Sequence, residues 1–596
     1  MSKVHVTIDN IPVSVEPGTT IHQAAKSVGI HIPTLCASTE IKHTPGACRV
    51  CLVDVEGQRS LVASCVFPVA EGMVVRTTTE RVRKTRKMVV ELLLSNHPTE
   101  CNHCIRNGNC ELQKVAEQTG VREVRFDIPP FPKEGAIDLS SPSIVRDTRK
   151  CIHCHRCVTV CDAIQGASVL TPAWRGSDLK AMPAFNLPLL ETNCTACGQC
   201  ILVCPVGALY EKDDTASVWM ALQDPKKHVI VQEAPAIRAN LGEEFGMPAG
   251  SLVTGKMITA LRRLGFDKVF DTNFTADLTI IEEGNELLKR VKEGGTLPMI
   301  TSCSPGWIKF CEHFYPDLLD HLSTCKSPQQ MFGALAKTYY AKVAGIDPKD
   351  IISVSIMPCT AKKFEASRAE MCDSGYRDVD YVLTTRELAR MIKEAGIDFV
   401  NLPDGDYDAP MGEYTGAATI FGATGGVMEA ALRTVYAVVT GENLPSLDIT
   451  PVRGLDGVKE AAVKVGGLGD VKVAVAHGLA NARKIMDRIR DKKADWAFIE
   501  IMACPGGCVS GGGSPIPTSN EIRTLRAGAL YRDDGSVQQY RQSHENPSIK
   551  KIYETFLKEP LGHKSHELLH TRYTKRGTDV PHRDALGESE GHGKKH

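Results

Sequence analysis

The N-terminal 30 residues show the period-two alternation of apolar and polar positions that is typical of strands. Residues 4–8 and 11–15 alternate in this way, and the Asp9-Asn10 pair between them has turn chemistry. Thr19 or Thr20 can then cap a short helix in the stretch IHQAAKSVG. The pattern predicts a small domain of two strands followed by a helix.

A different pattern begins near residue 228, where short apolar runs alternate with helical periodicity. The runs are HVIVQ, KVFDT, LPMIT, IISVSIMP, VDYVLTT and WAFIEIMA. Strands that alternate with helices predict an α/β domain with a largely parallel sheet. Between the two regions, residues 81–96 have the pattern of an amphipathic helix, which we expect to lie in solvent and to join neighbouring domains.

Composition narrows the possible functions. The chain has 596 residues with 70 basic and 71 acidic side chains, a formal net charge of −1, which argues against nucleic-acid binding. The first residues enter strand periodicity directly, so no secretory signal is expected, and no apolar run approaches the length of a membrane span. Most of the 22 cysteines are clustered like metal ligands, which argues against disulfides and predicts a reducing, cytoplasmic location.

The densest cysteine pattern is a pair of C-x2-C-x2-C-x3-C runs between residues 151 and 204. In two-cluster ferredoxins, each run gives three thiolates to one cubane cluster and its fourth to the other. We therefore expect two 4Fe–4S clusters, one held by Cys151, Cys154, Cys157 and Cys204 and the other by Cys161, Cys194, Cys197 and Cys200. Two structural zinc sites are the alternative, which a doubled eight-cysteine run does not favour.

Two further ligand sets lie upstream. Cys36, Cys48, Cys51 and Cys65 follow the predicted sheet and helix, and together these features resemble a 2Fe–2S ferredoxin of the β-grasp type, although the spacing departs from the plant pattern. Next come His97, Cys101, Cys104 and Cys110. Three cysteines and one histidine suit zinc as well as iron. Their place between iron–sulfur motifs favours a third 4Fe–4S cluster, with one imidazole ligand.

Three of the predicted strands run directly into cysteine loops. LPMIT leads to SCSPGW, IISVSIM to PCTAKKFE, and WAFIEIM to ACPGGCVSGGG. Because sites in α/β sheets form at the carboxyl ends of strands, we expect these loops to converge, with Cys359, Cys504 and Cys508 as ligands there. The glycines allow the backbone to approach a bulky cofactor. The three cysteines outside all motifs, Cys311, Cys325 and Cys372, are expected to be small buried hydrophobic residues.

These features predict a multi-domain protein. We expect a 2Fe–2S ferredoxin-like domain at 1–80, a 4Fe–4S domain with one histidine and three cysteine ligands at 81–140, a two-cluster ferredoxin domain at 141–225, an α/β catalytic domain at 226–575, and a disordered tail at 576–596, which is rich in glycine, histidine and charge.

The three loops resemble those of the catalytic subunit of the iron-only, or FeFe, hydrogenases. That family carries the signatures TSCCPxW, MPCxxKxxE and ExMACxxGCxxGGGxP. Here they stand as TSCSPGW from Thr301, MPCTAKKFE from Met357, and EIMACPGGCVSGGGSP from Glu500. The upstream cluster arrangement is similar to that of the larger members. The resemblance covers about residues 1 to 575.

The resemblance implies an H-cluster, a 4Fe–4S cubane bridged through a cysteine sulfur to a two-iron unit that carries CO, cyanide and a dithiolate. Cys508 matches the bridging position, and Cys359 and Cys504 match two further cubane ligands. The positions that line the two-iron unit in the family correspond to Pro235, Gln329, Met357, Lys362, Phe421 and Met502. Lys362 would offer its ammonium to a cyanide.

The first loop departs from the family pattern, which has two adjacent cysteines. By register, Cys303 stands at the family's proton-relay position and Ser304 at its ligand position. An alkoxide is a harder ligand than a thiolate and a weaker one for this iron. Either Ser304 coordinates, or Cys303 shifts to coordinate while Ser304 relays, or another group supplies the fourth ligand.

Glu283 and Glu286 match the family's carboxylate relay, with Ser323, Arg290 and Cys303 as its other members. The two glutamates are three residues apart and share one helix face. The alternative is an ordinary exposed charged face on which Glu286 pairs with Arg290.

The resemblance favours an enzyme that oxidises H2 and reduces protons reversibly. The alternative is an iron–sulfur protein without H2 chemistry, such as an electron relay, an assembly protein or a sensor. No G-x-G-x-x-G follows a strand and opens a helix, so the chain is not expected to bind NAD(P) itself. We expect its partner to be a soluble ferredoxin or flavin and iron–sulfur subunits that bind NAD(P), with the second favoured.

Overall fold

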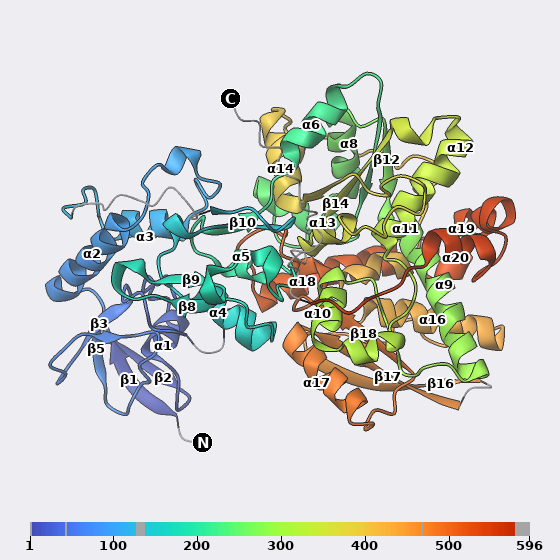
Figure 1. Cartoon of the computed structure of the whole chain (residues 1–596). Coiled ribbons are helices and arrows are strands. Elements are labelled where there is room, and N and C mark those ends of the chain that lie inside the picture. The colour runs from blue at the N-terminus through green and yellow to red at the C-terminus, as the bar shows by residue number, and fades with distance from the viewer. Residues whose placement is uncertain (1–2, 42–43, 127–136, 467–468, 578–596) are drawn as a thin grey trace, which may run out of the picture.

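The computed structural model describes residues 3–41, 44–126, 137–466 and 469–577. The chain forms two lobes (Figure 1). The iron–sulfur motifs up to about residue 210 occupy one lobe, and the α/β region fills the other. The tail predicted at 576–596 lies, from residue 578 on, outside the described residues.

The first domain is a five-stranded sheet with strand order β2-β1-β5-β3-β4. The strands are β1 (Val4–Ile8), β2 (Ile11–Val15), β3 (Leu52–Val55), β4 (Val62–Ala63) and β5 (Val74–Arg76). As the alternation predicts, β1 and β2 form a hairpin, with Asp9 and Asn10 in the left-handed conformation at the turn. Thr20 caps α1 (Ile21–Ser27) with a complete capping box.

Helix α2 (Glu80–Ser95) is the predicted amphipathic connection and leads to α3 (Glu111–Gln118). The next domain repeats one short unit twice, with α4 (Arg156–Thr159) in the first copy and α5 (Gln199–Val203) in the second. Its strands are β6 (Ile137–Asp138), β7 (Ile144–Asp147) and β10 (Leu209–Glu211) in one sheet, and β8 (Thr171–Ala173) and β9 (Lys180–Met182) in a hairpin.

The α/β lobe contains two four-stranded sheets, whereas the sequence predicted one largely parallel sheet. The first has the order β12-β11-β14-β15 and is parallel throughout; the second has the order β13-β18-β17-β16, in which only the β16–β17 pair is antiparallel. The strands are β11 (His228–Glu233), β12 (Lys268–Asp271), β13 (Met299–Ile300), β14 (Ile351–Met357), β15 (Tyr381–Thr384), β16 (Val458–Val465), β17 (Gly469–His477) and β18 (Phe498–Met502). Strands β16 and β17 were not among the predicted runs.

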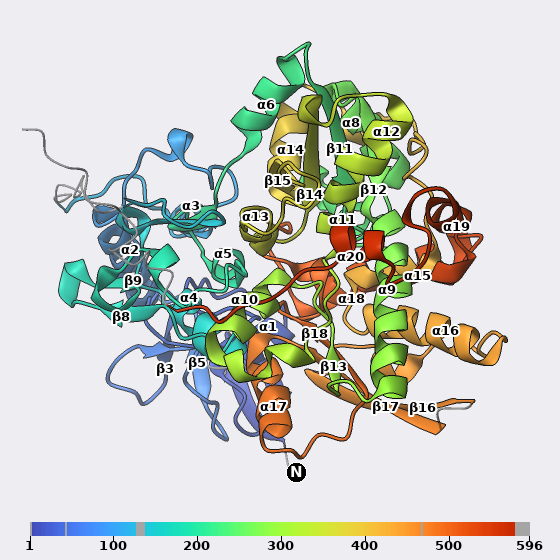
Figure 2. The same cartoon turned by 45° about the vertical axis from the view of Figure 1, so that its right-hand side comes forward.

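Helices cover both sheets (Figure 2). Helix α9 (Thr272–Glu293) belongs to both cores, because Phe274 packs with the first sheet and Ile280 with the second. The other helices of this lobe are α6 (Thr215–Gln223), α7 (Ile237–Asn240), α8 (Thr254–Leu264), α10 (Pro305–Phe314), α11 (Pro328–Leu335), α12 (Ala341–Ala344), α13 (Ala361–Ala366), α14 (Thr385–Glu394), α15 (Gly416–Thr419), α16 (Gly426–Thr440), α17 (Leu479–Arg490), α18 (Asn520–Arg532), α19 (Pro547–Ile552) and α20 (His563–Leu569). No helix in the described part of the chain is long and apolar enough to cross a membrane.

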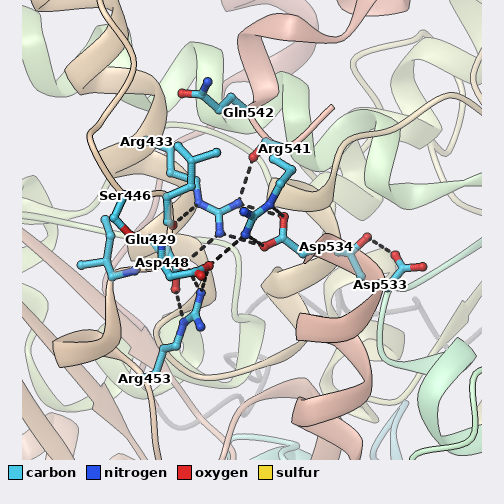
Figure 3. Close-up of polar contacts among 12 residues, drawn as sticks. Glu429, Arg433, Ser446, Asp448, Arg453, Asp533, Asp534, Arg541 and Gln542 are labelled. Carbon is cyan, nitrogen blue, oxygen red and sulfur yellow. Dashed lines mark hydrogen bonds and ion pairs between the residues drawn. The ribbon is translucent and has the colours of Figure 1, made fainter. Parts of the chain in front are cut away.

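A buried ion-pair network fastens the segment after α18 to α16. Asp534 accepts hydrogen bonds from Arg433, at 2.9 Å, and from Arg541, at 2.7 Å (Figure 3). Arg433 also pairs with Glu429 one turn earlier on α16. The N-terminus of α16 in turn holds Glu500 of β18, since Gly425 and Met428 donate backbone N–H groups to its carboxylate. The network therefore supports the strand that leads to Cys504.

Candidate functional site

One cavity collects the three cysteine loops. Strand β14 of the first sheet delivers one loop, and β13 and β18 of the second sheet deliver the other two. The site thus lies between the carboxyl ends of two sheets. Among the residues that line the cavity are all of those predicted there, namely Pro235, Cys303, Ser304, Gln329, Met357, Cys359, Lys362, Phe421, Met502, Cys504 and Cys508.

Cys303 and Ser304 have different neighbours. Cys303 packs with the apolar group that includes Ala276 and Ile280 of α9. Ser304 Oγ accepts a hydrogen bond of 3.2 Å from the backbone N–H of Ala503, next to Cys504. The thiol therefore lies on the α9 side of the cavity, and the hydroxyl lies beside the β18 loop.

Lys362 is held by a carboxylate to which the sequence assigned no role. Its ammonium group donates to Glu365 Oε2 at 2.9 Å and to the Cys303 carbonyl oxygen at 3.1 Å. Glu365 Oε2 also accepts from Gln329 Nε2 at 3.0 Å and from Ser327 Oγ at 2.8 Å. Glu365 is thus the anchor of two cavity-lining side chains. The sequence did contain a signal for this role, because Glu365 is the last residue of the MPCTAKKFE motif.

Glycines let the loops meet closely beside the cavity. A Cβ atom at Gly511 would collide with the Pro358 carbonyl oxygen, and one at Gly512 would lie 2.5 Å from the Cys197 carbonyl oxygen. Both positions therefore require glycine. Three thiols on tightly packed loops, those of Cys359, Cys504 and Cys508, with Cys303 and Ser304 beside them, suit a 4Fe–4S cubane, because such a cluster takes four protein ligands, usually cysteine thiolates.

The proposed relay residues are buried, which contradicts the alternative of an exposed charged face. Glu283 is 2% exposed and Glu286 is 7% exposed. Ser323 Oγ donates to Glu286 Oε2 at 3.1 Å, and the Glu286–Arg290 ion pair of that alternative does exist, at 2.6 Å. Burial, reinforced by the nearby charge of Glu286, raises the pKa of Glu283 to about 8, whereas a hydrogen bond with Ser323 acts in the opposite direction. Ser323 therefore lies between the two carboxyl groups.

The two ferredoxin ligand sets form two separate cavities with the cross-over expected from sequence. Cys151, Cys154, Cys157 and Cys204 line one, and Cys161, Cys194, Cys197 and Cys200 line the other. His153 and His155 in the first run have positive φ angles, as do Ala196 and Gly198 at the equivalent positions of the second. The shared left-handed turns fold each C-x2-C-x2-C stretch around its cavity.

The upstream ligand sets are also brought together. All four cysteines of the first set are buried, and Cys51 Sγ lies 3.2 Å from Cys65 Sγ. His97 lines one cavity with Cys101, Cys104 and Cys110. The ring of His97 is buried, and its Nδ1 atom has no hydrogen-bond partner among the residues that the structure describes. A buried imidazole nitrogen without a partner fits the ligand role.

The cavities adjoin one another in a branched order. A Cβ atom at Gly207, three residues after Cys204, would lie 2.8 Å from Cys104 Sγ. Cys36 of the first ligand set and Cys154 of the same ferredoxin cavity belong to one hydrophobic core, so these two domains pack against each other. At the other end, Gln199 donates to the Ser510 carbonyl oxygen at 3.0 Å, in the loop that carries Cys504 and Cys508.

The cysteines outside the motifs differ from one another. Cys311 and Cys325 are buried, as expected, but Cys372 is exposed, so the expectation of a buried residue is wrong there. Cys372 lies in a turn-rich segment in which its thiol donates to the Ala369 carbonyl oxygen.

Comparison with known proteins agrees with this geometry. The family described as the iron only hydrogenase large subunit, C-terminal domain, matches residues 227–512, and that of the iron hydrogenase small subunit matches residues 520–576. The NADP-reducing hydrogenase subunit HndD of Solidesulfovibrio fructosivorans is 51% identical, over 97% of this chain and 100% of that protein. Iron hydrogenase 1 of Clostridium pasteurianum is 42% identical, over 96% and 100%.

The chain belongs to the FeFe hydrogenase family. A solved structure of the FeFe hydrogenase HydA1 from Chlamydomonas reinhardtii aligns with a TM-score of 0.55 and 46% identity, covering 61% of this chain and all of that one. The interpretation as an FeFe hydrogenase enzyme is therefore confirmed, in preference to the relay, assembly or sensor alternative.

The remaining part of this FeFe hydrogenase matches iron–sulfur modules, which confirms the predicted fold class. A 2Fe–2S iron–sulfur cluster binding domain matches residues 1–80, and the NADH-ubiquinone oxidoreductase-G iron–sulfur binding region matches residues 86–125. The ferredoxin-like domain of NADH-quinone oxidoreductase subunit 3 matches residues 141–210. The enzyme thus combines 2Fe–2S and 4Fe–4S binding domains with an H-cluster domain.

Proposed function

We propose that this FeFe hydrogenase holds its H-cluster through Cys359, Cys504, Cys508 and Ser304, with Cys303 as the last proton donor. The observation that carries the proposal is the single cavity that receives these side chains together with the matched lining residues. When bound, the H-cluster supplies the two-iron site at which H2 is cleaved into protons and electrons or formed from them. The protein supplies ligands, an apolar enclosure, and separate routes for protons and electrons.

Hydrogen bonds orient the polar residues of the enclosure. Glu365 fixes the ammonium group of Lys362 inside the cavity, where it can donate to an anionic ligand such as cyanide. Gln329 is fixed from two sides, since its Oε1 atom accepts from Ser355 Oγ at 2.6 Å and its Nε2 group donates to Glu365. The apolar wall comes from Met357, Phe421 and Met502, together with Pro235.

The proton route that we propose runs from Glu286 through Ser323 and Glu283 to Cys303. A relay member must both accept and donate a proton near neutral pH, and a carboxyl group with a pKa of about 8 can do both. Ser323 bridges the carboxylates because a hydroxyl accepts one hydrogen bond while it donates another. The position of Cys303 against α9 supports its place at the inner end of this route.

For electrons we propose a branched route through one 2Fe–2S and three accessory 4Fe–4S clusters. The clusters held by the Cys36 set and by the His97 set would each pass electrons to the cluster of Cys151. That cluster would pass them through the cluster of Cys194 to the H-cluster. Close approach of Gly207 to Cys104 and of Gly512 to Cys197 supports short transfer distances at two of these steps. The domains proposed at 1–80, 81–140, 141–225 and 226–575 follow this division.

We infer that the partners are flavin and iron–sulfur subunits that bind NAD(P), with soluble ferredoxin as the alternative. The relative HndD is named a subunit of an NADP-reducing hydrogenase, and the N-terminal modules match subunits of NADH oxidoreductases. Two separate entry points for electrons, at the Cys36 and His97 clusters, also suit an assembly of several subunits. A reducing cytoplasmic location remains our expectation, supported by 22 free cysteines.

Infrared spectroscopy of matured enzyme tests the H-cluster assignment. We expect bands in the CO and cyanide region, H2/D+ exchange activity, reversible inhibition by CO, and loss of the two-iron signals before those of the other clusters in air, because a site that binds H2 must keep an open position. Active protein that showed no CO or cyanide bands would refute the assignment. Affinity purification from the native cell identifies the partner: co-purifying NAD(P)-binding subunits support the complex, and an isolated chain that reduces ferredoxin contradicts it.

A further inference from the structure

An ion pair between a buried arginine and a half-buried glutamate joins the loops of two proposed clusters at the branch of the electron route. Arg156 donates to both carboxylate oxygens of Glu111, at 2.8 Å each. Arg156 stands between Cys154 and Cys157, whereas Glu111 directly follows Cys110. The pair therefore links the ferredoxin-like domain to the His97 domain.

The same pair flanks a third ligand position. Arg156 Nη1 donates to the Val203 carbonyl oxygen at 3.4 Å, and the backbone N–H of Glu111 donates to the Pro205 carbonyl oxygen at 3.0 Å. Val203 and Pro205 are the two chain neighbours of Cys204. The pair thus reaches the loops of three of the four proposed ligands of one cluster.

The guanidinium group is far more buried than its partner. Arg156 is 4% exposed, and its Nε atom has no hydrogen-bond partner within the described part of the chain. The Glu111 side chain is 39% exposed. Because water screens the carboxylate more than the guanidinium, the net charge that acts inside this part of the protein is positive.

The internal repeat provides a reference position. In the second C-x2-C-x2-C run, the residue equivalent to Arg156 is Gln199, which is buried and neutral. The two halves therefore place a cationic and a neutral side chain at the same point beside two clusters of the same type. A buried charge is one of the factors that set cluster potentials.

We propose that Arg156 and Glu111 are positioning residues that set the reduction potential of the 4Fe–4S cluster of Cys151, Cys154, Cys157 and Cys204. This inference rests on the cluster assignment proposed above. Reduction adds one negative charge to the cluster, so a buried cation favours the reduced state and raises the potential. The cluster at the branch would then collect electrons from both inputs.

The test is a redox titration followed by electron paramagnetic resonance on full-length enzyme that carries its accessory clusters but lacks the two-iron unit. Arg156→Gln introduces the side chain found at the equivalent position of the second run, Gln199. We expect the midpoint potential of one 4Fe–4S signal to fall by at least about 59 mV, a tenfold change in the ratio of reduced to oxidised cluster. Glu111→Gln should raise the same signal by a smaller amount. Arg156→Lys keeps the charge and should stay close to wild type.

Opposite shifts in the two neutral variants distinguish an electrostatic role from a merely structural one. Arg488→Gln, which breaks an exposed pair with Glu460 in the α/β lobe, is the matched control and should shift nothing. Shifts in the same direction, or none, with iron content intact would overturn the inference. If the Arg156→Gln variant loses iron, the Glu111→Gln variant provides the test. A midpoint potential that does not rise in Glu111→Gln would then overturn the inference. Wild-type enzyme without three accessory 4Fe–4S signals would instead refute the cluster assignment.

Discussion

Lys362 and Glu365 form an ion pair of 2.9 Å at the wall of the catalytic cavity, one turn apart on α13. Both side chains are almost fully buried, so each charge depends on the other. Glu365→Gln should leave the ammonium group of Lys362 without its anion and displace it. We expect at least about tenfold lower turnover, on the scale of one lost buried charge contact, and changed cyanide bands in the infrared spectrum. Glu370→Gln, which breaks a more exposed pair with Arg368, is the control and should change neither.

The proton route predicts a loss of turnover without a loss of cofactor. Glu283→Gln and Glu286→Gln keep the shape of the side chain but remove its ability to accept a proton. Turnover should fall by roughly 10²-fold or more, the scale of a positioned acid–base group, while the visible spectrum stays unchanged. Glu293→Gln at the exposed end of the same helix is the control. Normal turnover in both variants would remove these carboxylates from the route.

The pKa of Glu283 predicts a pH-dependent protonation state. Burial raises this pKa from the usual glutamate range to about 8, so the carboxyl group is protonated at neutral pH and ionises as the pH rises through about 8. Infrared difference spectra of protein without the two-iron unit should show a protonated carboxylic acid that disappears over this range. The band should be missing in Glu283→Gln. A band that disappears near pH 4.5, the ordinary pKa of a glutamate, would contradict the prediction that burial raises the pKa of Glu283.

Variants of the first loop separate a relay from a ligand. Cys303→Ala should leave the cubane intact and abolish most turnover if Cys303 relays protons, whereas loss of iron would make Cys303 a ligand. Ser304→Cys should be tolerated if Ser304 occupies the ligand position, because it restores the thiolate found in the family. Iron content and activity of both variants, measured side by side, decide between the assignments.

Iron content tests the number of clusters. One 2Fe–2S cluster, three accessory 4Fe–4S clusters and the H-cluster cubane amount to about 18 irons before the two-iron unit is inserted. Zinc at the His97 set would instead give about 14 irons and one zinc. His97→Ala should affect only one 4Fe–4S signal, whereas a variant of the exposed Cys372 should affect none.

The amino-acid sequence by itself determined which cysteines are grouped around each of the ferredoxin and His97 cavities, because such residues lie in short loops whose spacing is a local property. The cross-over between Cys157 and Cys204 could be predicted for this reason, as could the capped helix after Thr20. The sequence also located the three catalytic loops, since strand periodicity runs directly into each cysteine motif.

Tertiary structure decided what depends on contacts between distant segments. The division into two sheets was not predictable from the strand runs, because periodicity reports whether a strand is buried and not which strand it pairs with. The helix face of Glu286 and Arg290 has the pattern of a solvent-exposed surface, and only packing against the loop of Ser323 buries it. In the same way, Glu111 and Arg156 are 45 residues apart and meet only because the cluster loops are folded together.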